Sequence, residues 1–469
     1  QRGAHALRAG VDVVHNADRI VFPRAARGSY TFSSLANFLA GTYNNAGYTQ
    51  TFGETDVDQD ATSLGVYVQD AWSVGSSLTL NLGVRYDLQF LETVNTDTDN
   101  VSPRVGFAWV PSSSRRLVVR GSAGVFYDRV PLRALANALL SAHNTTSLDA
   151  LRQTTVALSP GQAGAPVFPN VLAAPVPSVT LFNLTTMDRD LQSASSRQAS
   201  LEVERQLSAG TTVSAAYSYV GGRDLLMAIN QNVPSCLPVG SNNGCRPIPA
   251  YANDSRYMSA GRSATHALSL TLNQRATSWA SYRATYTLAR AKNDVGEFFF
   301  SGPIDPFDVS KDWARADNDR RHALVVSGSI ESPAISRDSA WSGLLRDWQL
   351  SALLQAYSAT PFTIASGVTT LQGTAGRPIV DGAFIARNTG VGDEFATLNL
   401  RLQRAFTIAG SVRAEAAVEV FNVTNVVNEI ARNTTFGNGA YPGSPAATFG
   451  QVTAVGEPRS AQIALRLRF

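Results

Sequence analysis

The sequence is poor in charge, in lysine, in cysteine and in long apolar runs. Charged residues make up 16% of its 469 positions, against about 25% in typical soluble domains, while hydrophobic residues stand at an ordinary 44%. Lys292 and Lys311 are the only lysines, and the formal net charge is +3. This balance lacks the strongly basic footprint of a nucleic-acid-binding protein, so we expect no nucleic-acid partner.

Long apolar runs and cysteine-based sites are both missing. No segment approaches the roughly 18 consecutive apolar residues of a membrane-spanning helix. This does not exclude a membrane β-barrel, because the apolar residues of barrel strands alternate with polar ones and form no long run. The two cysteines, Cys236 and Cys245, lie nine positions apart, a spacing that resembles no zinc site. A small disulfide loop in an oxidising compartment is the expectation for this pair.

Motifs of enzymes and cofactors are absent as well. The sequence contains no HExxH, CxxC, GxSxG or phosphate-loop motif. Its five histidines are scattered. We therefore expect no catalytic residues, no metal site and no cofactor, and an enzyme is not the expected function.

What the sequence does contain is alternation with a period of two. From Leu78 to Phe90 every second residue is apolar, and the positions between them are polar or glycine. Side chains of a strand point alternately to opposite faces, so the pattern predicts a two-sided strand. The segment Ser77–Phe90 has 14 residues, whereas soluble strands usually have about 5–6 residues and about 9–11 tilted residues span a membrane.

The same pattern recurs and predicts about sixteen strands. They lie near residues 5–16, 28–33, 46–56, 61–74, 77–90, 101–110, 115–129, 197–208, 211–222, 264–277, 280–293, 321–332, 347–361, 396–408, 411–424 and 458–469.

The connections between these strands alternate in length. Tight turns are expected at Gly75–Ser76, Pro111–Ser114, Ala209–Gly210, Ser278–Trp279 and Ala409–Gly410, and long connections at 91–100, 130–196, 223–263, 294–320, 362–395 and 425–457. Outer-membrane barrels have short periplasmic turns and long extracellular loops. The expected fold is therefore all-β, an antiparallel transmembrane β-barrel that occupies residues 1–469 as one domain. The alternative is a soluble sheet with one wet face, which strand length and loop sorting disfavour.

Several short segments resemble TonB-dependent receptors, and most closely their Oar-like branch. The segments are Val66-Tyr-Val-Gln-Asp-Ala-Trp-Ser-Val74, Leu78-Thr-Leu-Asn-Leu-Gly-Val-Arg-Tyr-Asp87, Ser102-Pro-Arg-Val-Gly-Phe-Ala-Trp109, Arg120-Gly-Ser-Ala-Gly-Val-Phe-Tyr-Asp128, Asp319-Arg-Arg-His322, Trp348-Gln-Leu-Ser351, Thr360-Pro-Phe-Thr363, Phe421-Asn-Val-Thr-Asn425 and Phe449-Gly-Gln-Val452 with the terminal Phe469. Their order and spacing cover the chain from about residue 60 to its end.

The resemblance implies more than these residues supply. Such receptors share a barrel of about 22 strands, an N-terminal plug and a TonB box. The sixteen strands expected here would leave about six strands, the plug and the TonB box before Gln1. We therefore interpret the chain as the C-terminal portion of such a barrel, or as a truncated relative. Its expected surroundings are outer-membrane lipid and, by resemblance, the TonB complex.

The last strand is a candidate assembly signal. Apolar residues occupy alternate positions up to the terminal aromatic, namely Ala461, Ile463, Leu465, Leu467 and Phe469. This pattern resembles the signal that the outer-membrane barrel assembly machinery recognises. The alternative is an ordinary closing strand.

One long connection gathers acidic and basic residues. They are Asp305, Asp308, Asp312, Asp317, Asp319, Arg320 and His322. Carboxylate clusters can hold calcium, but this spacing matches no twelve-residue calcium loop. Neighbouring arginines also compete for the carboxylates, so an ion-paired loop is the favoured interpretation.

The function indicated by these features is TonB-dependent uptake of a large ligand across the outer membrane of a Gram-negative-type bacterium. The ligand could be a siderophore, an oligosaccharide or a peptide. Two alternatives stay open. One is a passive 16-strand porin, because barrels of that size leave an aqueous channel. The other is a surface adhesin or export platform whose loops matter more than its lumen.

Overall fold

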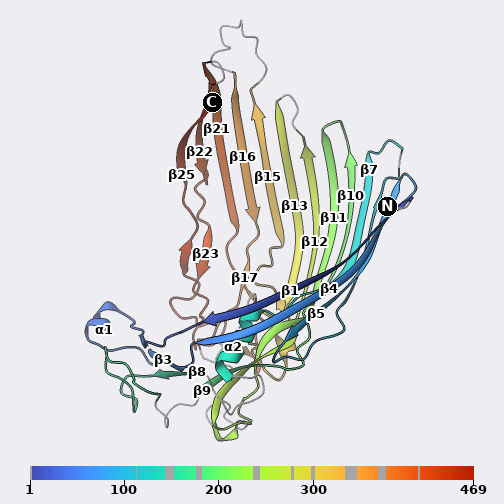
Figure 1. Cartoon of the computed structure of the whole chain (residues 1–469). Helices are drawn as coiled ribbons and strands as arrows, with labels where there is room; N and C mark the ends of the chain where they lie inside the picture. Colours follow the sequence, from blue (N-terminus) through green and yellow to red (C-terminus); the bar gives the residue numbers. More distant parts are fainter. Residues whose placement is uncertain are drawn as a thin grey trace.

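One large curved sheet dominates the chain (Figure 1). The structure is a computed structural model that describes residues 3–111, 113–142, 153–175, 182–235, 243–275, 279–296, 302–332, 346–367, 376–409 and 412–469. The sheet has 16 strands, and all but β9 and β14 follow one another as antiparallel neighbours, which we call the wall. The wall strands are β1 (His5–Val21), β4 (Asp56–Val74), β5 (Leu78–Leu91), β6 (Val101–Trp109), β7 (Leu117–Tyr127), β10 (Ser195–Gln206), β11 (Thr211–Asn230), β12 (Tyr251–Gln274), β13 (Ala280–Asn293), β15 (His322–Glu331), β16 (Trp348–Tyr357), β21 (Phe395–Ala409), β22 (Val412–Phe421) and β25 (Ser460–Arg468).

The wall is an open trough in the described part of the chain. β1 and β25 form its two edges, and neither is paired with the other. Figure 1 shows the strands curving around a common interior, with the two edges facing each other across the open side. The all-β, antiparallel expectation is confirmed, whereas closure into a barrel stays a prediction.

Two of the predicted strands do not belong to the wall. Residues 28–33 and 46–56 contain β2 (Ser29–Tyr30) and β3 (Tyr48–Gly53), which form a separate small sheet with β8 (Gln153–Leu158). Alternation marks any sheet with one buried face, and here Tyr48 and Leu158 are the buried residues of a loop cluster. The count of sixteen was matched only because β9 (Phe182–Met187) and β14 (Ala314–Arg315) attach to the wall.

The remaining elements lie in the long connections. They are α1 (Leu35–Leu39), α2 (Leu132–Ala142), η1 (Asn243–Cys245), η2 (Val309–Asp312), β17 (Pro361–Phe362), β18 (Ile379–Val380), β19 (Ala383–Phe384), β20 (Gly390–Val391), β23 (Glu429–Arg432) and β24 (Val452–Val455). We call the described parts of connections 22–55, 92–100, 128–194, 231–250, 294–321, 358–394 and 422–459 the crown. Figure 1 places the crown at one end of the wall and the C-terminus at the other.

The two faces of the wall differ as the alternation predicts. Residues of the apolar face are exposed, as in Val84 at 42% and Leu402 at 42%. On the other face Arg85 makes ion pairs with Asp12 of β1 at 2.8 Å and with Asp87 at 2.7 Å. An added side chain at Gly65 would collide with this guanidinium, so a larger residue there would force the Arg85 side chain to move away from its carboxylate partners.

The predicted sorting of connections also holds where the structure describes it. Gly75 has φ +75 in the tight turn between β4 and β5, a conformation that favours glycine. The long connection expected at 223–263 is shorter, because β11 and β12 continue to pair up to Asn230 and Ser255. The parts of these strands that extend into the crown bury Met227 and Ile229 in a cluster, which stabilises the extension.

Candidate functional site

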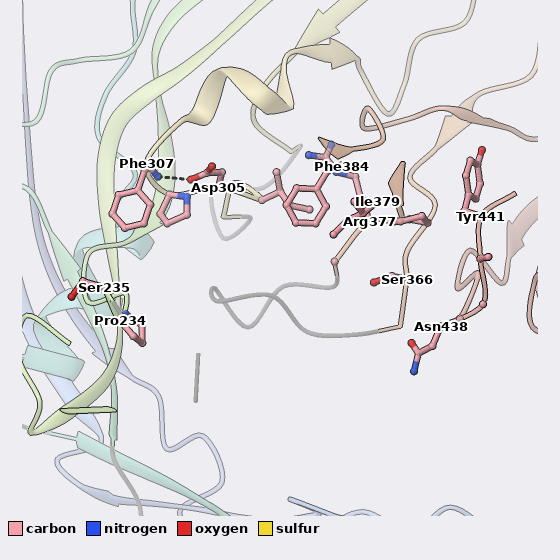
Figure 2. A pocket seen from close by; sticks show the side chains of 17 residues that line it. Pro234, Ser235, Asp305, Phe307, Ser366, Arg377, Ile379, Phe384, Asn438 and Tyr441 are labelled. Carbon is pink, nitrogen blue, oxygen red and sulfur yellow. Dashed lines mark hydrogen bonds between the residues drawn. The ribbon is translucent and has the colours of Figure 1, made fainter. Parts of the chain in front are cut away.

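The crown contains a cavity of about 840 Å³, which we call the crown pocket (Figure 2). Four connections line it, those between β11 and β12, β13 and β15, β16 and β21, and β22 and β25. The lining residues are Pro234, Ser235, Ile304, Asp305, Pro306, Phe307, Ser366, Gly376, Arg377, Pro378, Ile379, Phe384, Gly437, Asn438, Gly439, Ala440 and Tyr441. Proline, aromatic and aliphatic side chains dominate, as in most small-molecule sites.

Short elements fix the walls of this pocket. β18 and β19 form a hairpin that carries Ile379 and Phe384, which are paired across it. On the opposite side η2 begins after Asp308, whose carboxylate accepts a hydrogen bond from the backbone N–H of Ser310 at 3.1 Å. A side-chain acceptor at this position satisfies a backbone donor that would otherwise lack a partner. Figure 2 shows Phe307 and Phe384 on walls that face the same space.

A buried ion pair joins the two sides. Arg377 is 3% exposed, and its Nη2 lies 2.6 Å from Asp312 Oδ1. Asp312 also accepts a hydrogen bond from the backbone N–H of Ile304 at 2.8 Å. Burial lowers the pKa of the Arg377 guanidinium, while Asp312 opposes that shift. The Nε and Nη1 atoms of Arg377 have no hydrogen-bond partner in the described part of the chain.

A second, more exposed ion pair lies at the rim of the pocket. Lys311 Nζ is 2.5 Å from Asp305 Oδ2, and the backbone N–H of Phe307 donates to the same carboxylate at 2.9 Å. Burial alone would raise the pKa of Asp305, but the hydrogen bond from Lys311 and the backbone donors lower it overall. The hydrogen bond to Asp305 raises the pKa of Lys311.

The other predicted residues of this connection lie elsewhere. Asp319 has a fully buried side chain that pairs with Arg315 at 2.8 Å. Asp317 accepts a hydrogen bond from Asn388 Nδ2 at 2.6 Å. Arg320 lies over the ring of Tyr357, with 4.9 Å from Cζ to the ring centroid.

His322 belongs to the wall rather than to the crown pocket. It begins β15, and its Nδ1 lies 2.7 Å from the hydroxyl of Tyr286. The seven predicted residues therefore do not form one site. In the described part of the chain no group of three His, Cys, Asp or Glu side chains is arranged to hold a metal ion.

Away from the crown, the polar face of the wall carries cross-strand ion pairs. Arg401 of β21 reaches two carboxylates of β22, Glu415 at 3.0 Å and Glu419 at 2.7 Å. Arg120 of β7 similarly lies between two carboxylates of β10. Each of these two arginines has opposite charges on the neighbouring strand, as is favourable for cross-strand pairs on one face of a sheet.

The last strand lies on an edge of the wall. The predicted signal residues Ala461, Ile463, Leu465 and Leu467 pair with β22 residues of the apolar face. They share that face with the terminal Phe469, which is 92% exposed. Their role as an assembly signal stays a prediction. For the predicted disulfide, Cys245 ends η1, whereas Cys236 lies outside the described residues.

Sequence reasoning missed the crown pocket. Its aromatic residues Phe307, Phe384 and Tyr441 come from three different connections, and no motif links them. The only local signal was the unusual length of those connections, because long loops in compact folds are usually functional.

Comparison with known proteins gives a family. Residues 1–93 and 91–384 match the family described as "Outer membrane beta barrel domain". The TonB-dependent transporter Oar of Myxococcus xanthus is 28% identical over 254 residues, which cover 46% of this chain and 24% of that protein.

Solved structures share the fold at low identity. The outer membrane transporter YddB of Escherichia coli has a TM-score of 0.61 at 12% identity, over 98% of this chain and 51% of that one. FpvA of P. aeruginosa, solved with heterologous pyoverdines, has a TM-score of 0.54 at 11% identity, over 98% of this chain and 45% of that one.

This chain thus spans about half of these structures and a smaller share of Oar. None of the helices in its described part is long and apolar enough to cross a membrane. The family match covers well over half of the chain, and the paired, two-faced strands agree with it. The chain belongs to the outer membrane beta barrel domain family, it is a relative of the TonB-dependent transporter Oar, and its place is the outer membrane of a Gram-negative bacterium.

Proposed function

We propose that this chain supplies the wall and the ligand-binding crown of a transporter that takes up a large ligand by TonB-dependent transport. The observation that carries the proposal is the crown pocket, which four separate connections build above the polar face of the wall. Relatives named as TonB-dependent or outer membrane transporters support it. The ligand class stays open among siderophores, oligosaccharides and peptides.

The residues described here support the first step of such transport. A ligand would enter the crown pocket and contact Phe307 and Phe384, whose apolar surface is removed from water on binding. The buried pair of Arg377 with Asp312 would hold the two sides of the pocket at a fixed separation. The complete protein would then need a plug and a TonB contact, and the ligand would pass along the polar face of the wall.

The test is uptake by cells that carry the complete protein. Compounds depleted from a mixed medium are compared between cells with and without the protein, and with and without functional TonB. We expect at least one compound whose depletion requires both. Phe384→Asp should abolish that depletion, because it places a charge in an apolar site. Val391→Asp is the matched control, since Val391 is 56% exposed and does not line the pocket.

Depletion that requires the protein but not TonB would favour the passive porin. If no compound depends on the protein while cells with it adhere to a surface, the adhesin would be favoured. Either result would overturn the transport proposal.

A further inference from the structure

The connection between β7 and β10 does not project away from the wall. Its helix α2 begins directly above the polar face of β4 and β5. The side-chain amide of Gln89 accepts from the backbone N–H of Val130 at 2.8 Å and donates to the carbonyl of the same residue at 3.4 Å. Gln59 donates to the carbonyl of Leu132 at 3.3 Å. Gln89 lies on the same face of β5 as Arg85, which is the polar face.

The helix also contacts the wall far from β4. Asn137 donates to the hydroxyl of Tyr257 in β12 at 3.3 Å, and Ala228 of β11 belongs to the same buried cluster as the helix. β5, β6, β7, β10 and β11 separate β4 from β12 in the order of the sheet. One short helix can reach both strands only because the sheet curves around it, and Figure 1 shows α2 inside the trough.

Packing holds α2 in place on nearly every side. Ala134 and Ala138 are 0% exposed, Leu135 is 2% and Leu140 is 1%. Arg133, Asn137 and Ser141 form one polar stripe at helical spacing, and the buried apolar residues on the other sides show that α2 packs into the interior rather than lying free in a surface loop. The wall beneath it is buried as well: Val57 of β4, at 2% exposure, belongs to the same cluster as the helix, and Ala61, on the same face two residues beyond Gln59, is 3% exposed.

The segment that follows α2 is tied to the wall by a buried polar group. β9 pairs in parallel with β12. Thr186 of β9 donates to Asp254 at 2.6 Å, and Arg256 donates to the same carboxylate at 2.9 Å. Asp254 is 1% exposed, so this charge-assisted pairing lies away from solvent. The helix is therefore part of a packed unit and not a free lid.

We propose that α2 is a built-in constriction that closes the β4–β12 sector of the lumen mouth and leaves the β13–β25 sector as the route for ligand. The crown pocket lies above that open sector, because three of its four connections join β13 to β15, β16 to β21 and β22 to β25. This inference rests on the proposed uptake function. It specifies which part of the lumen mouth would limit the size of the ligand and determine its path.

The experiment measures access by cysteine labelling of the complete protein in intact cells. Cys236→Ser and Cys245→Ser remove the two native cysteines of the chain, so that they do not interfere with a reporter thiol. A single reporter is then placed on the polar face, either Ala61→Cys in β4, two residues from the α2 contact at Gln59, or Thr397→Cys in the open sector. A bulky, membrane-impermeant maleimide is the probe. Thr397 shares the polar face of β21 with Arg401 and is half-buried.

We expect the reporter at position 61 to react at least about ten-fold more slowly than that at position 397, because it must wait for local opening. Adding Leu135→Asp should undock α2 and bring the two rates together. Leu35→Asp is the matched control, since Leu35 lies on the crown helix α1 and is 74% exposed. It should leave both rates unchanged.

Equal rates at the two reporters in the protein with intact α2 would overturn the inference, and this comparison does not depend on whether the Leu135 variant folds. The assay needs neither ligand nor TonB. If position 61 is protected but no TonB-dependent uptake is found, only the proposed function is contradicted. If uptake is found but position 61 is not protected, only the proposed constriction is contradicted.

Discussion

Removing the carboxylate of Asp312 should open the crown pocket. The side chains of Arg377 and Asp312 are 3% and 8% exposed, so the pair lies in the interior of the crown. Asp312→Ala would leave a buried guanidinium with no carboxylate, and its Nε and Nη1 already lack partners among the described residues. Breaking a buried ion pair on one side costs about 3–5 kcal/mol, which corresponds to a factor of roughly 150 to 4,000 in an equilibrium constant.

The two members of the ion pair should differ in how much their removal costs. Arg377→Met removes the cation but leaves Asp312 bonded to the backbone N–H of Ile304, and the carboxyl group can become neutral by binding a proton. We therefore expect a smaller loss for Arg377→Met than for Asp312→Ala. The double variant should recover most of the loss, because an apolar side chain then faces Phe384 with no unpaired charge.

Hydrogen exchange of the complete protein in nanodiscs is the assay. Backbone amides in 302–313 and 376–384 should exchange roughly 150 to 4,000 times faster in Asp312→Ala, up to the limit at which the crown is already open. Amides of β5 should not change, because that strand lies outside the crown. Exchange in Asp312→Ala within about twofold of the unmodified protein would refute the view that this pair fixes the pocket.

Three further predictions follow from single residues. The pKa of Asp305 is lowered in the folded crown, so its stabilisation is present above its ordinary pKa and is lost as pH falls below about 4; Lys311→Met should move that acid transition upward in limited proteolysis. Deleting Phe469 should lower the amount of assembled protein, and an unchanged amount of heat-modifiable folded protein would contradict the signal. Gly65→Ala should destabilise the wall by about 1–3 kcal/mol, because the added methyl group displaces the ion-paired Arg85, and the temperature of heat modification should fall. Gly106→Ala is the control, because a methyl group added there would lie 3.5 Å from its nearest neighbour, an ordinary contact.

The wall could be predicted from the sequence because its signal is local. The segment predicted at 77–90 is β5 (Leu78–Leu91), and the segment predicted at 280–293 is β13 (Ala280–Asn293). In each case successive side chains face two different environments, so polar and apolar residues must alternate along the strand. The same signal misassigned 46–56, because the small sheet that contains β3 also has one buried face.

The crown could not be predicted, because its contacts join residues far apart in the sequence. Arg377 and Asp312 are separated by a complete hairpin of the wall, and neither residue carries a pattern that names its partner. The helix α2 is short and lies in a connection where no strand period is present. Its position depends on Gln59 and Gln89, whose wall positions alone predict only a polar face.

The claim that this chain forms a receptor and not a passive pore is tested most directly by conductance of the complete protein in planar bilayers. The account predicts a nearly closed channel, because the plug of a TonB-dependent receptor would fill the part of the lumen that α2 leaves open. A steadily open channel of porin size would contradict it.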